Sequence, residues 1–365
     1  MRRDDVVQLA EQATLGALLL EPARLGEVQK WLRAGDFADL WHAQLFTTLL
    51  EHHAAHDPIA PQTVARALVD RVGSRQANMP RFADLLHVTP PHPDAIGYAR
   101  LVLDSGLRHE IAGQGVLLRA AALQSALDGV PQPILSTCNL VDAGLDVAAA
   151  RWAAGHGLPH DTVVVPLALR PALRNTEARM GADKYLTAHP ARDLLTERRH
   201  TVELIGALIA SPDHVAVVAT WLTPARIHDP AWRAIYATLV ELADLGQHVD
   251  LVTVAWEARK HAQHGPALPG LNELRAAVDD GWHTQVHSAA RSVAGDQIRH
   301  LADTGADQLL AGAANPGVLV TDLVDTGHLI ADALRRTATG LSRPVDTAAP
   351  QRQLTAVHTH QQVAR

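Results

Sequence analysis

A chain of 365 residues with 47% apolar side chains is long enough to bury two hydrophobic cores. Its formal net charge of −7 argues against a large basic face that would grip duplex DNA through its phosphates. The chain begins without an apolar signal region, no stretch reaches the roughly 18 apolar residues of a membrane span, and the one cysteine cannot form an internal disulfide. These features predict a cytoplasmic protein without membrane contact.

An internal repeat is the most informative feature of the sequence. Aligned without a gap, residues 11–65 and 201–255 share 14 identities in 55 positions. Mismatches such as Leu15/Ile205 and Phe46/Tyr236 keep an apolar side chain, as two copies of one core require. The chain is therefore predicted to be a tandem duplication, and both copies are acidic.

The elements of each copy are predicted to be helical, in the same order. Apolar residues recur at helical spacing from Leu15, and Glu21-Pro22 is expected to end that first helix. A short helix with Trp31 follows, and for this tryptophan a core or hairpin contact is favoured over base stacking. Asp39 and Asp229 are expected to cap the next helix, and the one after it is expected to begin at Pro61 and after Asp250.

A helical hairpin is expected to complete each copy. Its first arm is predicted to begin after the turn Pro90-Pro91-His92-Pro93, and short matching segments place Arg100 with Arg291 and Arg108 with Arg299. The predicted organisation is all-α, with a small helical bundle followed by a hairpin in each copy. The predicted bounds are 1–155 for the first copy, 156–196 for an ordered or partly extended linker, 197–340 for the second copy and 341–365 for a disordered tail.

The order of these motifs resembles that of a known family, the N-terminal domain of DnaB-type replicative DNA helicases. The residues that carry the resemblance are Glu11-Gln12 to Leu20, Asp36-Phe37, His42 to Phe46, Tyr98 to Val102 and, in the second copy, His228 to Tyr236 and Val249 to Val254. Trp232 stands where the family usually has histidine. The resemblance covers most of both copies, so the fold it implies is two such helical domains in tandem.

The resemblance also implies a function without catalysis. Helicases of this type hydrolyse ATP on a separate domain with a Gly-x-x-x-x-Gly-Lys-Ser/Thr phosphate loop, and no such run occurs in these residues. The family domain forms pairs through its hairpins, three pairs build a collar, and the collar receives primase. The resemblance therefore implies a replication scaffold that contacts a replicative helicase, a primase or copies of itself. The two copies are expected to pair within the chain, three chains to imitate a collar, and DNA to be contacted only indirectly, with no cofactor.

Candidate interaction residues lie on the hairpins, where several recur in both copies: Tyr98, Arg100, Arg108, His109, Arg291, Arg299 and His300. An ordinary solvated helix face is the competing interpretation of these positions. The alternative function is direct DNA binding by a replication or mobile-element factor, and it would use Arg170, Arg174, Arg179, Arg198 and Arg199.

A third hypothesis is a metal-dependent enzyme built on histidines. His52 and His56 are spaced so that a helix end could present both imidazoles on one face, with His53 and Asp57 beside them. The second copy does not share this cluster, so solvated histidines near a helix C-terminus are favoured, as they are for His358 and His360. Cys138 is expected to be a buried small hydrophobe, and no metal site is predicted.

Overall fold

The computed structural model describes residues 3–173, 175, 177–261 and 267–342, and it confirms the all-α prediction: these residues form helices, turns and loops and no strand. Contacts divide the chain into two compact units. The first comprises Met1–Arg192 and Gly295–Ala338, and the second comprises Asp193–Ala294 and Thr339–Arg365, each as far as the structure describes it.

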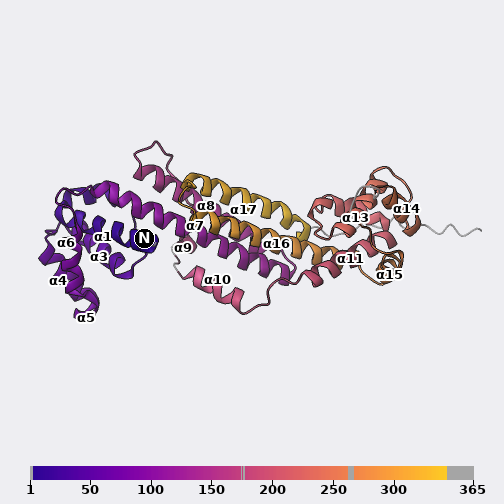
Figure 1. Cartoon of the computed structure of the whole chain (residues 1–365), viewed down its shortest axis with the longest axis horizontal. Helices are drawn as coiled ribbons and strands as arrows, with labels where there is room; N and C mark the ends of the chain where they lie inside the picture. Colours follow the sequence, from indigo (N-terminus) through magenta and orange to yellow (C-terminus); the bar gives the residue numbers. More distant parts are fainter. Residues whose placement is uncertain (1–2, 174, 176, 262–266, 343–365) are drawn as a thin grey trace, which may run out of the picture. The chain divides into compact units, whose positions relative to one another are not determined.

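The first unit begins with a bundle of helices and continues into a long hairpin (Figure 1). The bundle contains α1 (Arg3–Leu20), η1 (Pro22–Arg24), α2 (Leu25–Val28), η2 (Ala34–Asp36), α3 (Leu40–Ala55), α4 (Pro61–Val72), α5 (Ser74–Ala77) and α6 (Met79–Val88). The hairpin consists of α7 (Ala95–Asp128) and α8 (Gln132–Gly155). Leu15, Leu45, Phe46 and Leu49 are fully buried, so the apolar stripes predicted from their spacing form the core of the bundle.

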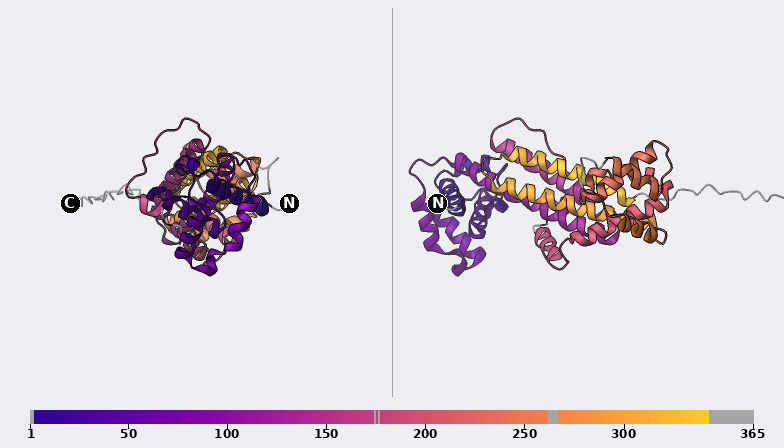
Figure 2. Two further views of the ribbon diagram at one scale, coloured as in Figure 1. Left: turned by 90° about the vertical axis from the view of Figure 1, so that its left-hand side faces the viewer. Right: turned by 45° about the vertical axis from the view of Figure 1, so that its right-hand side comes forward.

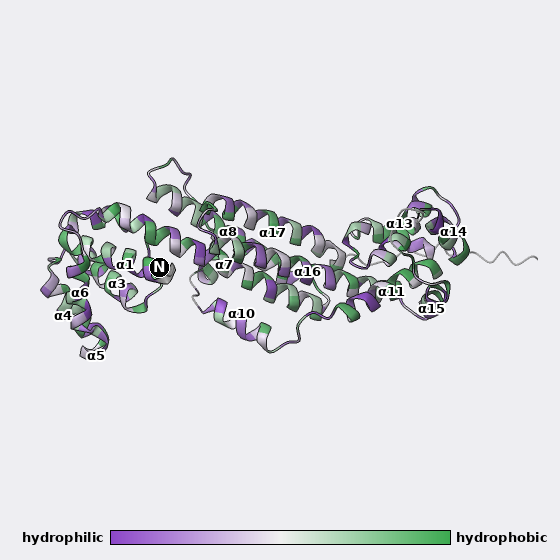
Figure 3. Ribbon diagram, in the orientation of Figure 1, coloured by the Kyte–Doolittle hydropathy of each residue, from purple (hydrophilic) through white to green (hydrophobic). Residues whose placement is uncertain are grey.

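The second unit repeats the bundle. It contains α11 (Leu194–Ala210), η3 (Pro212–His214), α12 (Val215–Ala219), η4 (Pro224–Arg226), α13 (Pro230–Asp244), α14 (Leu251–His261) and α15 (Leu271–Gly281). A second hairpin, α16 (Val286–Ala314) and α17 (Val320–Ser342), follows in the chain. Helices of both units carry hydrophilic and hydrophobic residues together, as amphipathic helices do (Figure 3).

The predicted helix starts are confirmed. The Asp39 carboxylate accepts hydrogen bonds from the backbone N–H groups of Trp41 and His42, and Asp229 does the same at the start of α13. The helix α4 begins at Pro61, and Asp250 forms a reciprocal capping box with Thr253 before α14. The long arm α7 is capped by Asp94, which accepts from the N–H of Gly97.

The region predicted to be a linker contains more helix than expected. Residues 156–169 are not helical, but α9 (Arg170–Leu173) and α10 (Ala178–Thr187) follow, and α10 packs against α7. The Arg179 side chain of α10 lies over Gly113 of α7, where an added Cβ would meet its Cδ at 3.4 Å. Of the tail predicted at 341–365, the first two residues belong to α17 (Val320–Ser342), and the rest, from 343 onward, lies outside the described part.

The second hairpin packs against the first within the first unit. Figures 1 and 2 show α16 and α17, in orange and yellow, lying alongside α7 and α8, in purple and magenta. The compact units therefore differ from the sequence copies, because most of the second hairpin is grouped with the first copy. The repeat bounds of 1–155 and 197–340 describe the duplication in the sequence and remain predictions.

Candidate interaction site: the paired hairpins

Small residues allow the two hairpins to approach closely. A Cβ added at Gly115 of α7 would lie 3.0 Å from the Cα and the Cβ of Ala306 in α16. A Cβ at Gly327 of α17 would lie 2.6 Å from a methyl group of Leu145 in α8. A Cβ at Gly115 would therefore press on backbone, whereas one at Gly327 would require the Leu145 side chain to shift.

Arg108 of α7 is the most buried cation of the contact, with 5% of its surface exposed. Its guanidinium donates to the backbone carbonyl of Asn315 at 3.0 Å and to that of Val318 at 2.6 Å, in the turn between α16 and α17. It also pairs with Asp104 at 2.7 Å on its own helix. The arginine thus adds a donor to two carbonyls of this turn, of which that of Asn315 also accepts from the N–H of Val318 at 3.2 Å, and Asp104 compensates its charge.

Further ion pairs join the first hairpin to the second. Arg119 lies 3.4 Å from Asp303 and also pairs with Asp307, and Asp142 of α8 pairs with both Arg335 and His328 of α17. These pairs have partly exposed side chains, so each contributes little stability compared with the Arg108 contact. They add charge complementarity, which fixes how the two hairpins align.

Arg151 of α8 attaches the first hairpin to its bundle. Its buried guanidinium pairs with Asp36 and with Glu110, the latter at 3.0 Å, and donates to the carbonyl of Trp31 at 3.0 Å. Burial raises the pKa of Asp36 and that of Glu110, while the Arg151 charge opposes both shifts. Trp31 itself is 3% exposed, and its ring lies 3.3 Å from where Gly155 would carry a Cβ, so its role is in the core and the hairpin contact.

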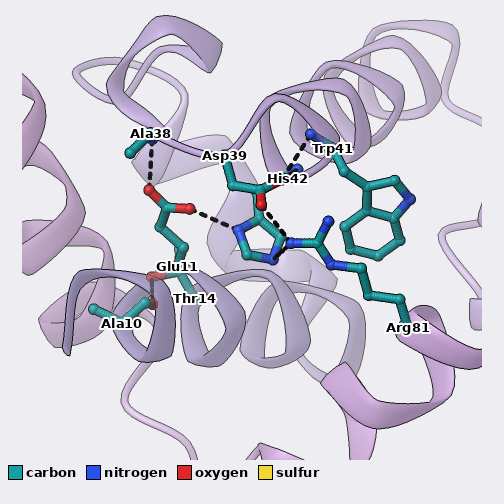
Figure 4. Close-up of polar contacts among 8 residues, drawn as sticks. All are labelled: Ala10, Glu11, Thr14, Ala38, Asp39, Trp41, His42 and Arg81. Atoms are coloured by element: carbon teal, nitrogen blue, oxygen red, sulfur yellow. Dashed lines mark hydrogen bonds and ion pairs between the residues drawn. The ribbon is translucent and has the colours of Figure 1, made fainter. Parts of the chain in front are cut away.

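A buried polar cluster holds the first bundle together where α1 meets α3 (Figure 4). Glu11 is 1% exposed, and its two oxygens accept from the N–H of Ala38 and from Nδ1 of His42, each at 2.6 Å. Nε2 of His42 lies 3.3 Å from the Arg81 guanidinium, which also pairs with Asp39 at 2.6 Å. Because a guanidinium only donates, Nε2 of His42 accepts from Arg81, and Nδ1 donates to the Glu11 oxygen.

Partial burial acts to raise the pKa of Asp39, but the hydrogen bonds from the Arg81 guanidinium and from the backbone N–H of His42, with the Arg81 charge, hold it below its usual value. The Arg81 guanidinium also lies over the Trp41 ring, 4.7 Å from its centroid. All charged members of the cluster therefore have partners. The cluster links α1, α3 and α6 and has a structural role.

The second bundle replaces this cluster in a coordinated way. The repeat places Thr201 at the position of Glu11 and Trp232 at that of His42, and Trp232 is fully buried. Arg198 of α11 stands in for Arg81: it pairs with Asp229 at 2.8 Å and with Glu273 of α15 at 2.6 Å. The arginine that pairs with the capping aspartate thus stands on the last helix of the first bundle and on the first helix of the second bundle. The capping aspartate itself is common to both copies.

A cavity of about 630 Å³ lies in the first unit beside the polar cluster. Its wall contains charged side chains that already bond to protein, as described above for Asp36, Asp39, Arg108 and Glu11. His109, also in the wall, accepts from Arg179 at 2.8 Å, and its partial burial and that cation lower its pKa. These five side chains stabilise the wall of the cavity. Because each already bonds to protein, none of them is available to bind a substrate.

The predicted interaction residues mostly bond within the chain. Arg100 donates to the carbonyl of Gly155 at 2.6 Å, Arg299 to that of Pro190 at 3.3 Å, and Arg192 lies 2.8 Å from Nδ1 of His300. Arg291 contacts His287 one turn away, and Tyr98 is half-buried. The partner of Arg108 proves to be the second hairpin of the same chain. At this position, a residue that recurs in both copies makes a contact within the chain.

The arginines of the DNA-binding alternative are also engaged. Arg170 donates to the carbonyl of Val165 at 3.1 Å, Arg179 to His109, and Arg199 lies 3.6 Å from Glu203. Arg198 has two carboxylate partners and belongs to α11 of the second unit rather than to a linker. Arg174 lies outside the described residues.

The histidine cluster does not form as a metal site would require. His56 takes the left-handed conformation at the end of α3, with φ 58°, so it leaves the helical face that carries His52. Within the described part of the chain, no group of three or more His, Cys, Asp or Glu side chains is placed to hold a metal ion. His358 and His360 lie outside it.

Cys138 is fully buried, and burial raises the pKa of its thiol to about 12, which suits the predicted hydrophobic role.

The Glu11–His42 pair and the Arg151 network were not predicted as sites from the sequence. Glu11 and His42 carry part of the family motif, so a signal was present, but their spacing of 31 residues does not show that they touch.

As to membranes, no single helix among the described residues is long and apolar enough to cross one, and one bent pair, Leu194–Ala210 with Pro212–Ala219, passes by length and composition alone.

Comparisons with known proteins agree with this architecture. The model of the DnaB-like helicase N terminal domain matches residues 5–104 and 202–291, which is more than half of the chain. The replicative DNA helicase DnaB of Mycobacterium leprae (strain TN) is 31% identical over 108 residues, 29% of this chain and 18% of the relative's length. No solved structure gives a significant match. With the domain matched twice, each time over a bundle that precedes a hairpin, the chain belongs to the DnaB-like helicase N-terminal domain family.

Proposed function

We propose that this protein is a non-catalytic scaffold of DNA replication, in which one chain supplies both members of a helicase-type domain pair. The observation that carries the proposal is the packing of α16 and α17 on α7 and α8 within one chain, through Arg108 and the close approach at Gly115. In a domain family that pairs through its hairpins, a covalently joined pair needs no second chain for that step.

The proposal includes the kinds of partner that the family suggests, namely a replicative helicase, a primase and further copies of this chain. Three chains, each with two matched domains, would present the six domains of a collar. The M. leprae relative is by name a replicative DNA helicase, and the chain matches 18% of its length. We further propose that the chain performs no ATP hydrolysis of its own, because its matched segments are N-terminal domains and its sequence has no phosphate loop.

The DNA-binding alternative receives less support. Its arginines are engaged by carboxylates, carbonyls or histidine wherever the structure describes them, and each would have to give up these partners to bind phosphate.

The test is the absolute mass in solution by light scattering, alone and after mixing with the host's replicative helicase and with its primase. We expect about three times the 39.2 kDa chain mass, or a complex with at least one of the two enzymes. A helicase without its N-terminal domain serves as the control and should not form the complex. A 39.2 kDa particle that binds neither enzyme and shifts a labelled DNA fork in a salt-dependent way would overturn the proposal in favour of DNA binding.

A further inference from the structure

An open apolar groove lies in the second unit between α14 and α15. It has a volume of about 420 Å³, and the buried side chains of Ile235 and Leu274 form its floor. Its walls carry Val252, Trp256 and Leu271, which are 72%, 64% and 56% exposed. Single exposed apolar residues are common, but a contiguous group that lines a groove marks a surface that binds another molecule.

The first repeat shows that this apolar wall is specific to the second. Gln62 and Arg66 of α4 stand at the repeat positions of Val252 and Trp256, and both are exposed polar residues. Where the first repeat has two polar residues on one solvated helix face, four positions apart, the second repeat therefore has a valine and a tryptophan. Neither Val252 nor Trp256 enters the core, so packing of the bundle does not explain these apolar residues.

In the first repeat a tryptophan lies at the corresponding region. The helices α6 and α15 correspond through the buried pairs Phe82/Leu274 and Leu85/Ala277, which places Ala77 opposite Pro269. Trp41 is 6% exposed and donates through its indole N–H to the carbonyl of Ala77 at 2.9 Å. In the second repeat Ala231 occupies the position of Trp41, and Pro269 lines the groove.

Charge defines the occupant further. Arg259 of α14 and Arg275 of α15 both line the groove and are exposed, and neither has an ion pair or hydrogen bond with the described residues. The adjacent Lys260, by contrast, is paired with Glu257 at 2.6 Å. Two unneutralised arginines around an apolar floor, in a repeat that is acidic as a whole, favour a ligand with carboxylates beside apolar side chains.

We propose that this groove binds an acidic amphipathic helix of a partner protein. Aromatic or large aliphatic side chains spaced four residues apart would enter between α14 and α15, where the first repeat relies on Trp41, and flanking carboxylates would pair with Arg259 and Arg275. The inference rests on the proposed function only in taking the chain to act through protein contacts.

The test uses three fluorescein-labelled designed helical peptides and the full-length protein, read by fluorescence anisotropy. The first peptide carries a Leu/Trp face flanked by glutamates, the second the same face flanked by lysines, and the third the composition of the first in scrambled order. We expect the acidic peptide to bind about tenfold more tightly than the basic one, and the scrambled peptide to be as weak as the basic one. Equal binding of the acidic and basic peptides would overturn the proposal.

Variants locate the binding. Trp256→Ala should weaken the acidic peptide about tenfold, whereas Trp282→Ala, an exposed tryptophan of the same unit outside the groove, should leave it unchanged. The double variant Arg259→Glu/Arg275→Glu should reverse the preference, so that the basic peptide binds more tightly. An equal effect of the two tryptophan variants would contradict the proposed position.

Other occupants would give different results, each of which overturns the proposal. If the mass in solution exceeds one chain and falls to one chain in Trp256→Ala, a second copy fills the groove. If a labelled single strand of DNA displaces the peptide from wild type and fails to bind the double arginine variant, the ligand is a nucleic acid. Neither helicase nor primase is present in these peptide assays. Failure of the groove proposal is therefore distinguishable from failure of the proposed function.

Discussion

Glu11 is a buried carboxylate whose two oxygens both have partners within 2.6 Å, on the backbone of Ala38 and on His42. Taking such a charge out of water is unfavourable, and the hydrogen bonds offset that cost only while both partners are present. The pair therefore specifies how α1 and α3 meet, and truncation of either side chain exposes the other to the full penalty.

Glu11→Ala should lower the free energy of unfolding by about 3 kcal/mol, because it leaves the buried His42 without the acceptor of its Nδ1 and the Ala38 N–H without its side-chain partner. Chemical denaturation monitored by circular dichroism measures this loss. Gln8→Ala, at an exposed position of the same helix, is the control and should change stability by less than about 0.5 kcal/mol. Equal losses for the two variants would mean that the Glu11 hydrogen bonds do not matter.

Asp229 makes stability depend on pH. Its burial acts to raise its pKa, but the hydrogen bonds from Arg198 and from the N–H groups of Trp232 and Ala231 lower that pKa below 3.8. A carboxyl group whose pKa is lower in the folded chain contributes stability above its unfolded value, and that stability is lost as the pH falls through the folded value.

Asp229→Asn keeps the helix cap and loses the ion pair, so at neutral pH it should cost about 0.2–1 kcal/mol. The difference from wild type should shrink as the pH falls below 3.8 and disappear once wild-type Asp229 is protonated. Thermal unfolding across this range measures it. A difference that stays constant with pH would show that the carboxylate charge is not responsible.

At the scale of elements, the crossing of α11 and α15 depends on two glycines that face each other. A Cβ at Gly206 would overlap the carbonyl of Ala277, and a Cβ at Gly281 would overlap the backbone of Gly206. The first bundle has Gly16 at the corresponding position, where a Cβ would overlap the hydroxyl of Thr89. Close packing thus explains the Gly-Ala pair that recurs inside the first helix of each repeat.

Gly206→Ala should destabilise the protein by about 1–3 kcal/mol, because backbone rather than a movable side chain blocks the added methyl group. Gly181→Ala is the matched control: Gly181 is also helical and has nothing within 4 Å of the added Cβ, so this variant should gain about 0.5–1 kcal/mol from helix propensity. Denaturant midpoints compare the two, and a stabilised Gly206→Ala would contradict the close crossing.

Helix starts and the bundle-plus-hairpin plan were predictable from sequence, because they depend on local signals. Aspartate caps, Pro61 at a first turn and apolar residues at helical spacing act within a few residues. The helix α10 was not predicted, since its apolar pattern is weak and it relies on packing against α7 beside Gly113. Long-range contacts left no local signal: the partners of Arg108 are 207 and 210 residues away in the chain.

The interaction residues show the same limit. Recurrence of Arg108 and Arg299 in both copies indicated a contact surface, but only the fold shows that Arg108 bonds to the second hairpin while Arg299 bonds to Pro190. The repeat alignment also does not show that Arg81 and Arg198 have the same role, because the two arginines stand on different helices of their bundles.

At the scale of the whole molecule, the hairpin contact is made within one chain. Arg108→Ala should cost about 1–3 kcal/mol, because it leaves the Val318 carbonyl at the α16–α17 turn without the arginine donor and Asp104 without its cation. Limited proteolysis, as well as the unfolding free energy, should report the change as faster cleavage within residues 295–338. Arg66→Ala, at an exposed position, is the control and should leave both unchanged.

The pairing of two hairpins within one chain has an evolutionary consequence. In a homodimer, every substitution appears on both sides of the two-fold axis, so a new surface necessarily arises twice. Here a single substitution changes one side only, as Trp41 against Ala231 and Arg66 against Trp256 illustrate. A fused pair is thus free to divide labour between its halves, and a ring of three such chains would offer three copies of a given surface where six identical subunits would offer six.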